Sequence, residues 1–511
     1  MLFNSFPFLF LFLPAVLIVY YCAARFGPRY AALALAIASF VFYGFWNPSA
    51  VILLATSIAF NFGSGFLIHR YEKRPPLQRA VLGLAVGGNI LLLAYYKYWF
   101  VLAGWLGAQL NLNLVSPGDG ILLPLGISFF TFTQIGYLID LRDGLARRDG
   151  LLDYVLFVTF FPHLIAGPIL YHRDIMPQFA AKETYRFNPE NLAVGFSIFV
   201  IGLAKKVVIA DTFSSHVGAG FANPARLDTY GAWTVALAYS LQIYFDFSGY
   251  SDMAVGLARM FGVRFPANFD SPFKSRSIIE FWQRWHITLS RYLNLYVYSP
   301  LSTWIIRRRL AQGRPISRQS MATPPAFLMT VALPTFCTMF LAGVWHGAGL
   351  PFLVYGLLHG FYLTVNHAWR VFGPRLKLPT PLHLVVSEMQ LVLTFLAVVA
   401  SLVIFRAKSV SDALEVFKGM LGLHGAFEGQ VSALELSPLA IGVLVSIGLV
   451  IARILPNSIE LFGSFSPVYP AVPVSAIQWV PNKAWGIVLG VIASVSILLL
   501  SGAAEFLYFF F

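Results

Sequence analysis

Long apolar runs separated by short polar stretches make up almost all of this 511-residue chain. A helix that crosses a bilayer needs about 20 consecutive apolar residues. On that rule we predict membrane helices near residues 6–24, 30–46, 50–68, 80–104, 121–140, 152–170, 191–210, 230–256, 326–344, 350–370, 385–405, 437–455 and 484–503. The runs near 152–170 and 276–300 are short or interrupted by Pro and Gly, which predicts half-spanning or re-entrant segments buried in protein. The pattern is typical of an all-α, polytopic integral membrane protein with about 11–13 helices in one domain, residues 1–511.

Two polar stretches interrupt the apolar runs. Residues 301–325 are basic, contain Pro, Ser and Thr, and show no apolar period, so we predict a cytoplasmic loop. Residues 408–437 include SDALEVFKGM (Ser411–Met420), which has a Ser in an N-cap position and apolar residues at helical spacing. That spacing predicts a short amphipathic helix on the membrane surface. We expect both stretches to be extramembrane connectors within the single domain.

Composition leaves little room for a soluble domain, because 58% of the residues are hydrophobic and 11% are charged. The formal net charge of +13 could indicate nucleic-acid binding. However, the basic residues cluster in short loops between apolar runs, such as His69–Arg79, Arg142–Gly150 and Arg307–Arg314. This is the positive-inside pattern of cytoplasmic loops that face anionic lipid. We therefore expect a lipid bilayer, and no nucleic acid, as the partner of these charges.

Familiar motifs of soluble enzymes are missing from the sequence. There is no GxxxxGK[ST], HExxH, GxSxG or CxxC motif, and no GxGxxG follows a strand pattern. A soluble NTPase, zinc protease, serine hydrolase or dinucleotide oxidoreductase is therefore disfavoured. We expect neither a metal ion nor a tightly bound cofactor.

His346 is the most informative polar residue at membrane depth. It lies in LAGVWHGAG (Leu341–Gly349), directly after an apolar run. The small residues on both sides would let another backbone or a ligand come close. Imidazole is well suited to take a proton from a hydroxyl near neutral pH, so His346 is a candidate catalytic base. The alternative is a histidine that only forms a hydrogen bond with a neighbouring helix.

A second histidine, His286, lies in EFWQRWHITLSRYL (Glu280–Leu293) among aromatic and charged residues. On one helix Trp282 and His286 would share a face at i, i+4, and Glu280 and Arg284 would form an ion pair at the same spacing. Aromatic surface would then flank the imidazole. The alternative is an aromatic belt at the membrane interface with snorkelling arginines.

Further polar residues lie in three apolar segments. FDFSGYSDM (Phe245–Met253) holds Asp246 and Asp252, which need partners because a charge in hydrocarbon costs about 2.5 kcal/mol or more. We expect arginine or backbone partners from the region Arg259–Arg291, and a framework role for both carboxylates. His163 lies between prolines in FFPHLIAGPI, and His359 follows His346 by 13 residues. We expect these two histidines to line or support a site rather than to catalyse.

Taken together, several of these motifs resemble one family. FPHLIAGPI, IYFDFSGYSDMAVGL, VRFPANFDSPF, EFWQRWHITLSRYL and GVWHGA, in this order and with a Phe/Tyr-rich C-terminus, are similar to the membrane-bound O-acyltransferase family. Within it the chain resembles the bacterial alginate O-acetyltransferase branch. The resemblance implies a many-helix fold around a central tunnel through the membrane. It also implies that an acyl-CoA, most simply acetyl-CoA, is the donor substrate on the cytoplasmic side.

The resemblance also implies roles for individual residues. His346 matches the histidine regarded as catalytic in the family, and His286 matches a second polar residue of the same tunnel. Trp282, Trp285, Trp345 and Ser290 would shape that tunnel. The acceptor would be an extracellular or periplasmic polysaccharide, reached directly or through a periplasmic acetyltransferase partner at a bacterial inner membrane. One segment departs from the family: relatives usually have a charged RDY-type sequence and a Gly-rich GGNR loop, where this chain has RYLNLYVYSPLSTW (Arg291–Trp304).

A transporter or polysaccharide-export channel is the alternative function. Broken helices and buried charges occur in such proteins as well. Many transporters are built from two related halves, whereas this sequence shows no repeat between its halves. The two histidine motifs with small-residue neighbours also favour the acyltransferase.

Overall fold

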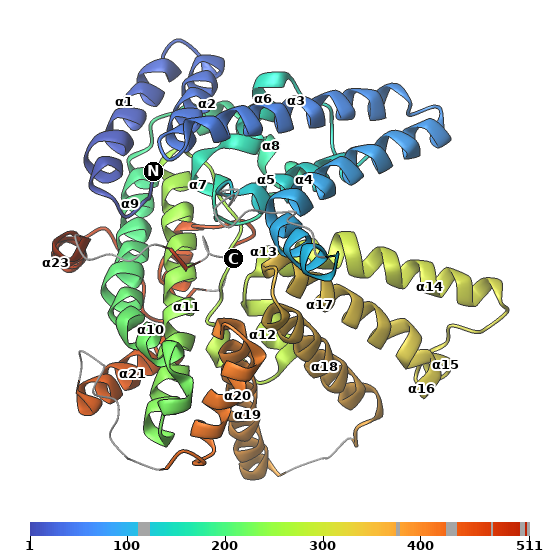
Figure 1. Ribbon diagram of the computed structural model, residues 1–511. Coiled ribbons are helices and arrows are strands. Elements are labelled where there is room, and N and C mark those ends of the chain that lie inside the picture. Colours follow the sequence, from blue (N-terminus) through green and yellow to red (C-terminus); the bar gives the residue numbers. More distant parts are fainter. Residues whose placement is uncertain (111–122, 375–378, 426–436, 472–473, 501–505, 508–511) are drawn as a thin grey trace. The chain divides into compact units, whose positions relative to one another are not determined.

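The computed structural model describes residues 1–110, 123–374, 379–425, 437–471, 474–500 and 506–507 (Figure 1). Within these residues the regular elements are helices and there is no β-strand, which confirms the all-α prediction. Five helices in this part of the chain are long and apolar enough to cross a membrane: Pro48–Arg70, Pro75–Gly107, Pro189–Ala222, Pro324–His346 and Leu384–Arg406. Shorter apolar helices lie at Phe8–Ala24, Pro28–Gly44, Pro438–Arg453 and Lys483–Leu499. These helices make the protein a multi-pass membrane protein.

The chain divides into two compact units whose segments alternate along the sequence. The first unit contains Met1–Ala204, Gly249–Ala267 and Ser458–Ala503, and the second contains Lys205–Ser248, Asn268–Asn457 and Ala504–Phe511. Helix α11 (Thr229–Met260) contributes residues to both. The prediction of a single domain stays a prediction.

The first unit holds the N-terminal helices, and neighbouring helices such as α3 and α4 run side by side (Figure 1). Its helices are α1 (Leu13–Ala24), α2 (Pro28–Gly44), α3 (Pro48–Arg70), α4 (Pro75–Leu110), α5 (Ile127–Arg142), α6 (Leu151–Thr159), α7 (Phe161–Leu164), α8 (His172–Ala180), α9 (Pro189–Ala204), α22 (Ser458–Leu461) and α23 (Lys483–Leu499). The interruption predicted near 152–170 is confirmed, because α6 ends at Thr159 and only the short α7 follows.

Glycines let α9 pack closely against the C-terminal part of α11. A Cβ added at Gly195 would lie 2.6 Å from the Gly256 carbonyl oxygen, and one at Gly202 would lie 2.6 Å from the Gly249 carbonyl oxygen. Any larger residue would have to push the helices apart. Close backbone approach at small residues is the usual way that helices associate in membranes, where lipid supplies no hydrophobic drive for packing.

The second unit holds all but two of the motifs' candidate residues. Its helices are α10 (Ser214–Ala222), α12 (Ile278–Arg284), α13 (Ile287–Leu293), α14 (Ser299–Ala311), α15 (Arg318–Met321), α16 (Pro324–Phe327), α17 (Leu333–His346), α18 (Leu350–Phe372), α19 (Thr380–Arg406), α20 (Val410–Met420) and α21 (Pro438–Arg453). Helices α17 and α18 form a close pair (Figure 1).

Two expectations for the polar connectors had different outcomes. The helix predicted at Ser411–Met420 is confirmed as α20, but the N-cap predicted at Ser411 is wrong. The N-cap is Ser409, whose hydroxyl accepts a hydrogen bond from the Asp412 N–H. The loop predicted over 301–325 is wrong over most of its length, because α14 runs to Ala311 and the short α15 and the start of α16 also lie within it. Pro300 fits the first turn of a helix, and the arginines that follow are good helix formers, so a basic composition did not mean a loop. The rest of the 408–437 connector, residues 426–436, lies outside the described residues.

Candidate active site

His346 is the last residue of α17, and it is buried. The close packing of α17 on α18 comes from glycines: a Cβ at Gly343 would lie 2.5 Å from the Phe352 carbonyl oxygen. A Cβ at Gly356 would lie 2.4 Å from the Met339 carbonyl oxygen. This confirms that small residues beside His346 admit another backbone.

Aromatic rings surround the imidazole of His346. The ring of Phe405 is 5.0 Å away and that of Tyr355 is 5.8 Å away, both edge to face. The ring of the preceding residue, Trp345, is at 4.8 Å. Apolar walls on several sides limit the entry of water, which strengthens electrostatic interactions at the ring.

His286 lies between α12 and α13 and adopts a left-handed backbone conformation, with φ of 43°. The prediction that Trp282 and His286 share a helix face at i, i+4 is therefore wrong, because α12 ends at Arg284. The predicted ion pair within α12 is present, with Arg284 Nε 3.0 Å from Glu280 Oε1. A residue with a side chain in this conformation costs about 1–3 kcal/mol and persists only where its surroundings hold it.

Asn268 provides that support, and sequence reasoning did not single it out. Its Oδ1 lies 3.0 Å from His286 Nδ1 and accepts hydrogen bonds from the Thr288 N–H at 3.3 Å and from the Thr288 hydroxyl at 2.8 Å. Its backbone oxygen accepts a hydrogen bond from the Ile287 N–H at 2.9 Å. Asn268 belongs to VRFPANFDSPF, one of the motifs that carried the family resemblance, but no periodicity connects it with a residue 18 positions later.

The two predicted catalytic histidines meet at one tryptophan. The Trp345 ring is 6.1 Å from the His286 ring and 4.8 Å from the His346 ring. Phe247 of α11 packs edge to face on His286 at 4.8 Å. Residues that are 60 positions apart in the sequence therefore share one aromatic cluster within the second unit.

His359, in α18, is part of a different arrangement. The Trp282 Nε1–H donates to His359 Nδ1 at 3.1 Å. Because an indole N–H only donates, Nδ1 carries the lone pair and the proton of the neutral ring is on Nε2, which lies 2.9 Å from Ser401 Oγ. The Ser401 hydroxyl in turn donates to the Val398 carbonyl oxygen at 2.7 Å. Both nitrogens of His359 are engaged, so the ring anchors Trp282, as expected for a supporting residue.

A cavity of about 270 Å³ lies beside Trp282 and Ser290. Its other lining residues are Leu293, Asn294, Tyr298, Thr335, Thr338, Met339, Leu363 and His367. Thr335, Thr338 and Met339 belong to α17, the helix that ends at His346. Two of the four residues predicted to shape a tunnel thus line this cavity, whereas Trp285 packs between Phe281 and Phe269 at 5.6 and 5.1 Å.

Asp246 takes part in a buried charge cluster. Lys206 Nζ lies 2.8 Å from Asp246 Oδ1 and 2.6 Å from Asp211 Oδ1. The other Asp246 oxygen, Oδ2, accepts a hydrogen bond from the Leu507 N–H at 3.0 Å. Our expectation of partners from Arg259–Arg291 is wrong here, since the cation is a lysine earlier in the chain. A carboxylate satisfied in this way suits the framework role expected for Asp246.

Two predicted residues belong to the first unit. Asp252 Oδ2 accepts a hydrogen bond from the Ser458 hydroxyl at 2.6 Å. His163, in α7, has its Nε2 3.0 Å from the Phe157 carbonyl oxygen, and the ring is buried. A Cβ added at Gly167 would lie 2.5 Å from the His163 Cα, so the chain turns back tightly beside it. These contacts support structural roles within that unit.

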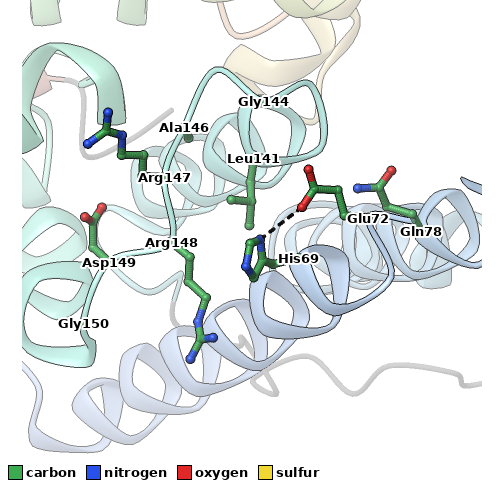
Figure 2. A pocket seen from close by; sticks show the side chains of 10 residues that line it. All are labelled: His69, Glu72, Gln78, Leu141, Gly144, Ala146, Arg147, Arg148, Asp149 and Gly150. Atoms are coloured by element: carbon green, nitrogen blue, oxygen red, sulfur yellow. Dashed lines mark ion pairs between the residues drawn. The ribbon is translucent and has the colours of Figure 1, made fainter. Parts of the chain in front are cut away.

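A second cavity, of about 580 Å³, lies in the first unit (Figure 2). His69, Glu72 and Gln78 line it from one side and Leu141, Gly144 and residues 146–150 from the other, with His69 Nδ1 3.7 Å from Glu72 Oε2. The cavity is lined by residues of two basic stretches, His69–Arg79 and Arg142–Gly150, which we predicted to be cytoplasmic loops. Their shared cavity agrees with a location of both stretches on the same side of the membrane. None of its lining residues is a predicted site residue. Among the described residues, no group of three or more His, Cys, Asp and Glu side chains could hold a metal ion.

Residues 141–312 match the model of the membrane-bound O-acyltransferase family. The chain is 37% identical over 457 residues to the peptidoglycan O-acetyltransferase of Helicobacter pylori, covering 83% of this chain and 80% of that one. It is 38% identical over 467 residues to the "probable alginate O-acetylase AlgI" of Pseudomonas aeruginosa, covering 88% and 81%. The chain belongs to the membrane-bound O-acyltransferase family. It is therefore an O-acyltransferase, and the transporter alternative is disfavoured.

A more distant relative is named for a different acyl group. The teichoic acid D-alanyltransferase of Streptococcus thermophilus is 30% identical over 258 residues, covering 48% of this chain and 57% of that one.

The family match contains Asn268 and His286 but ends before His346. Of the residues that meet at Trp345, only His286 thus lies in the matched segment.

Proposed function

We propose that this membrane-bound O-acyltransferase moves an acetyl group from acetyl-CoA on the cytoplasmic side to hydroxyl groups of an extracytoplasmic polysaccharide. The protein would lie in a bacterial inner membrane, and the acetyl group would reach the polymer directly or through a periplasmic acetyltransferase partner. The single observation that carries the proposal is the meeting of His286 and His346 at Trp345.

The relatives support an acetyl group and a polymer acceptor. Those named as O-acetyltransferases or O-acetylases match at 35–38% identity over most of the chain, and their names refer to alginate and peptidoglycan. The relatives named for alginate and for peptidoglycan are almost equally similar to this chain. They therefore support a polysaccharide acceptor in general better than they support either polymer in particular.

The chemistry follows from one hydroxyl, one thioester and one base. The attacking oxygen forms a bond to the acetyl carbonyl carbon while the carbon–sulfur bond of the thioester breaks. Imidazole of His346 takes the hydroxyl proton and returns it to the leaving thiolate, so that an ester and a free thiol result. In the alternative course the His346 imidazole attacks the thioester and the thiol leaves, and the acceptor hydroxyl then takes the acetyl group from the imidazole to form the ester.

The apolar surroundings of His346 support this role. Phe405, Tyr355 and Trp345 exclude water around the ring, and water would otherwise compete with the acceptor hydroxyl for the acyl group. The cavity beside Trp282 and Ser290 offers room for a small acyl group or a sugar hydroxyl next to the same helix.

The test replaces His346 with Ala in cells that make an O-acetylated polymer and lack their own copy of the gene. We expect polymer acetylation to fall about 100-fold or more, because acid–base catalysis by a positioned side chain contributes about 10²–10⁴-fold. The variant must be present in membranes at the wild-type level. His216→Ala, which removes another buried imidazole of the second unit, in α10, is the matched control for the loss of a histidine.

The donor is tested separately with purified protein in lipid nanodiscs and radiolabelled acetyl-CoA. Label should move to added polysaccharide, or to the periplasmic partner when that protein is supplied. Normal acetylation by a correctly inserted His346→Ala variant would contradict the proposed chemistry. Transfer only from a donor other than acetyl-CoA would contradict the donor.

A further inference from the structure

The loop before α12 and the turn before α13 hold each other through their backbones. The Asp270 N–H donates to the Arg284 carbonyl oxygen, and the Ile287 N–H donates to the Asn268 carbonyl oxygen, both at 2.9 Å. Ser271 and His286 each adopt a left-handed backbone conformation, with φ of 45° and 43°. Such conformations in residues with side chains cluster where the surroundings position a functional group.

The hydrogen bonds of Asn268 define which ring nitrogen of His286 carries the proton. The Thr288 N–H can only donate, so the Asn268 side-chain atom that it faces is the amide oxygen. The same oxygen faces His286 Nδ1 at 3.0 Å, and it can only accept. In the neutral ring the proton is therefore on Nδ1, and the lone pair is on Nε2.

We infer that Asn268 is a positioning residue that holds His286 with its proton on Nδ1, so that Nε2 acts as a hydrogen-bond acceptor in the reaction. This inference rests on the proposed function, in which His286 takes part in acyl transfer. The position of the proton also restricts what His286 can do in the reaction. A ring with its lone pair on Nε2 accepts a hydrogen bond from a hydroxyl or thiol, whereas it donates none from that atom to a developing oxyanion.

Two aromatic side chains pack on the imidazole of His286. Phe247 from α11 and Trp345 from α17 present aromatic rings, which carry no charge. Thr288, at the start of α13, binds the amide oxygen from the other side and keeps its orientation. Thr288 therefore fixes the orientation of the Asn268 amide, and the amide fixes the orientation of the His286 imidazole.

A matched control lies in the same loop. The Asn457 side-chain amide donates to Asp270 Oδ1 at 3.0 Å and to Ser271 Oγ at 3.1 Å. Asn457→Ala loosens the loop that carries Asn268 but leaves the contact between Asn268 and His286 in place. It separates general disorder of the loop from loss of the hydrogen bond to the ring.

The experiment compares wild type, Asn268→Ala, Asn268→Asp and Asn457→Ala as full-length protein in nanodiscs, by acetyl transfer from labelled acetyl-CoA across a range of pH. We expect Asn268→Ala to lower kcat about 10- to 100-fold with little change in the KM for acetyl-CoA, as is usual when the partner that orients a histidine is lost. We expect Asn457→Ala to lower the unfolding temperature and to keep kcat within about twofold, since its amide donates to Asp270 and Ser271 and the hydrogen bond between Asn268 and His286 is kept.

Asn268→Asp keeps an acceptor at the same place and should restore much of the activity at high pH. A carboxylate beside the ring favours the protonated imidazole, which cannot accept a proton, so activity is lost at a higher pH than in the wild type. The acidic limb of the pH profile should therefore move to higher pH. This shift is a result that a purely structural role of Asn268 would not produce.

The inference is overturned if folded Asn268→Ala keeps wild-type kcat, if Asn457→Ala loses as much kcat, or if Asn268→Asp keeps the wild-type pH profile. His286→Ala and His346→Ala in the same assay separate this failure from failure of the proposed function. If both histidine variants keep full activity, the proposed chemistry fails. If they lose activity while Asn268→Ala keeps it, only the role of Asn268 fails.

Discussion

His286 and His359 are two buried histidines of the second unit that differ in how their ring nitrogens are used. Nδ1 of His359 accepts a hydrogen bond from the Trp282 indole N–H, and its Nε2 lies 2.9 Å from Ser401 Oγ. The Ser401 hydroxyl donates in turn to the Val398 carbonyl oxygen. Nδ1 of His286 instead bonds Asn268, and the rest of the ring packs between Phe247 and Trp345. The first ring accepts a hydrogen bond from an indole N–H through Nδ1, and the second donates through Nδ1 to an amide oxygen. Burial and aromatic neighbours are similar at the two sites, so the partner of Nδ1 is what distinguishes them: the lone pair is on Nδ1 in His359 and on Nε2 in His286.

The largest expected effect is on activity, at His286. His286→Ala should lower acetyl transfer about 10²–10⁴-fold, the contribution usual for a positioned acid–base group. The unfolding temperature should fall as well, because a buried ring and its hydrogen bond to Asn268 are lost, so transfer is compared per folded protein. Transfer of labelled acetyl groups and thermal unfolding of the same preparation measure both. If the His286→Ala variant retains more than a third of wild-type acetyl transfer, His286 does not take part in the reaction as proposed.

The next effect is on stability, at His359. His359→Ala removes the acceptor of the buried Trp282 N–H and opens a cavity, which together should cost about 2–4 kcal/mol. The unfolding temperature should drop clearly, whereas kcat of the folded fraction should fall by less than about tenfold, since the ring's nitrogens are engaged by the protein. Loss of activity without loss of stability would place His359 in the reaction instead.

A smaller effect is expected at Ser401. Ser401→Ala removes the hydrogen-bond partner of His359 Nε2 but leaves the contact with Trp282, so the cost should be about 1 kcal/mol. Thermal unfolding measures it. In the double variant with His359→Ala the two costs should be less than additive, because the residues act in one chain of hydrogen bonds. Full additivity would show that the chain does not act as a unit.

The smallest effect is expected at Thr288. Thr288→Val removes the hydroxyl that donates to Asn268 Oδ1, but the Thr288 backbone N–H bond to that oxygen persists. Acetyl transfer should fall about two- to threefold, the size expected from one hydrogen bond among several. Thr288→Ser should keep wild-type activity. A loss as large as that of Asn268→Ala would mean that Thr288, not Asn268, controls the orientation of His286.

Hydrophobic pattern predicted most of the fold and much less of the site. Apolar runs located helices such as α3 and α19, because length and apolarity are local properties. The break at His286 was missed, since a left-handed residue other than Gly leaves no mark in the pattern. Asn268 and Lys206 were missed as partners for a different reason. Their contacts with His286 and Asp246 join distant positions, and only the folded chain brings them together.

The contact between Asp246 and Leu507 has a consequence for how the protein is made. The Asp246 carboxylate accepts a hydrogen bond from a backbone N–H that lies 261 residues further along the chain. During synthesis the ribosome must add all those residues before this donor exists. Until then Asp246 Oδ2 lacks this donor. Leu507 therefore completes, near the end of synthesis, a polar cluster whose Lys206 and Asp211 are made much earlier.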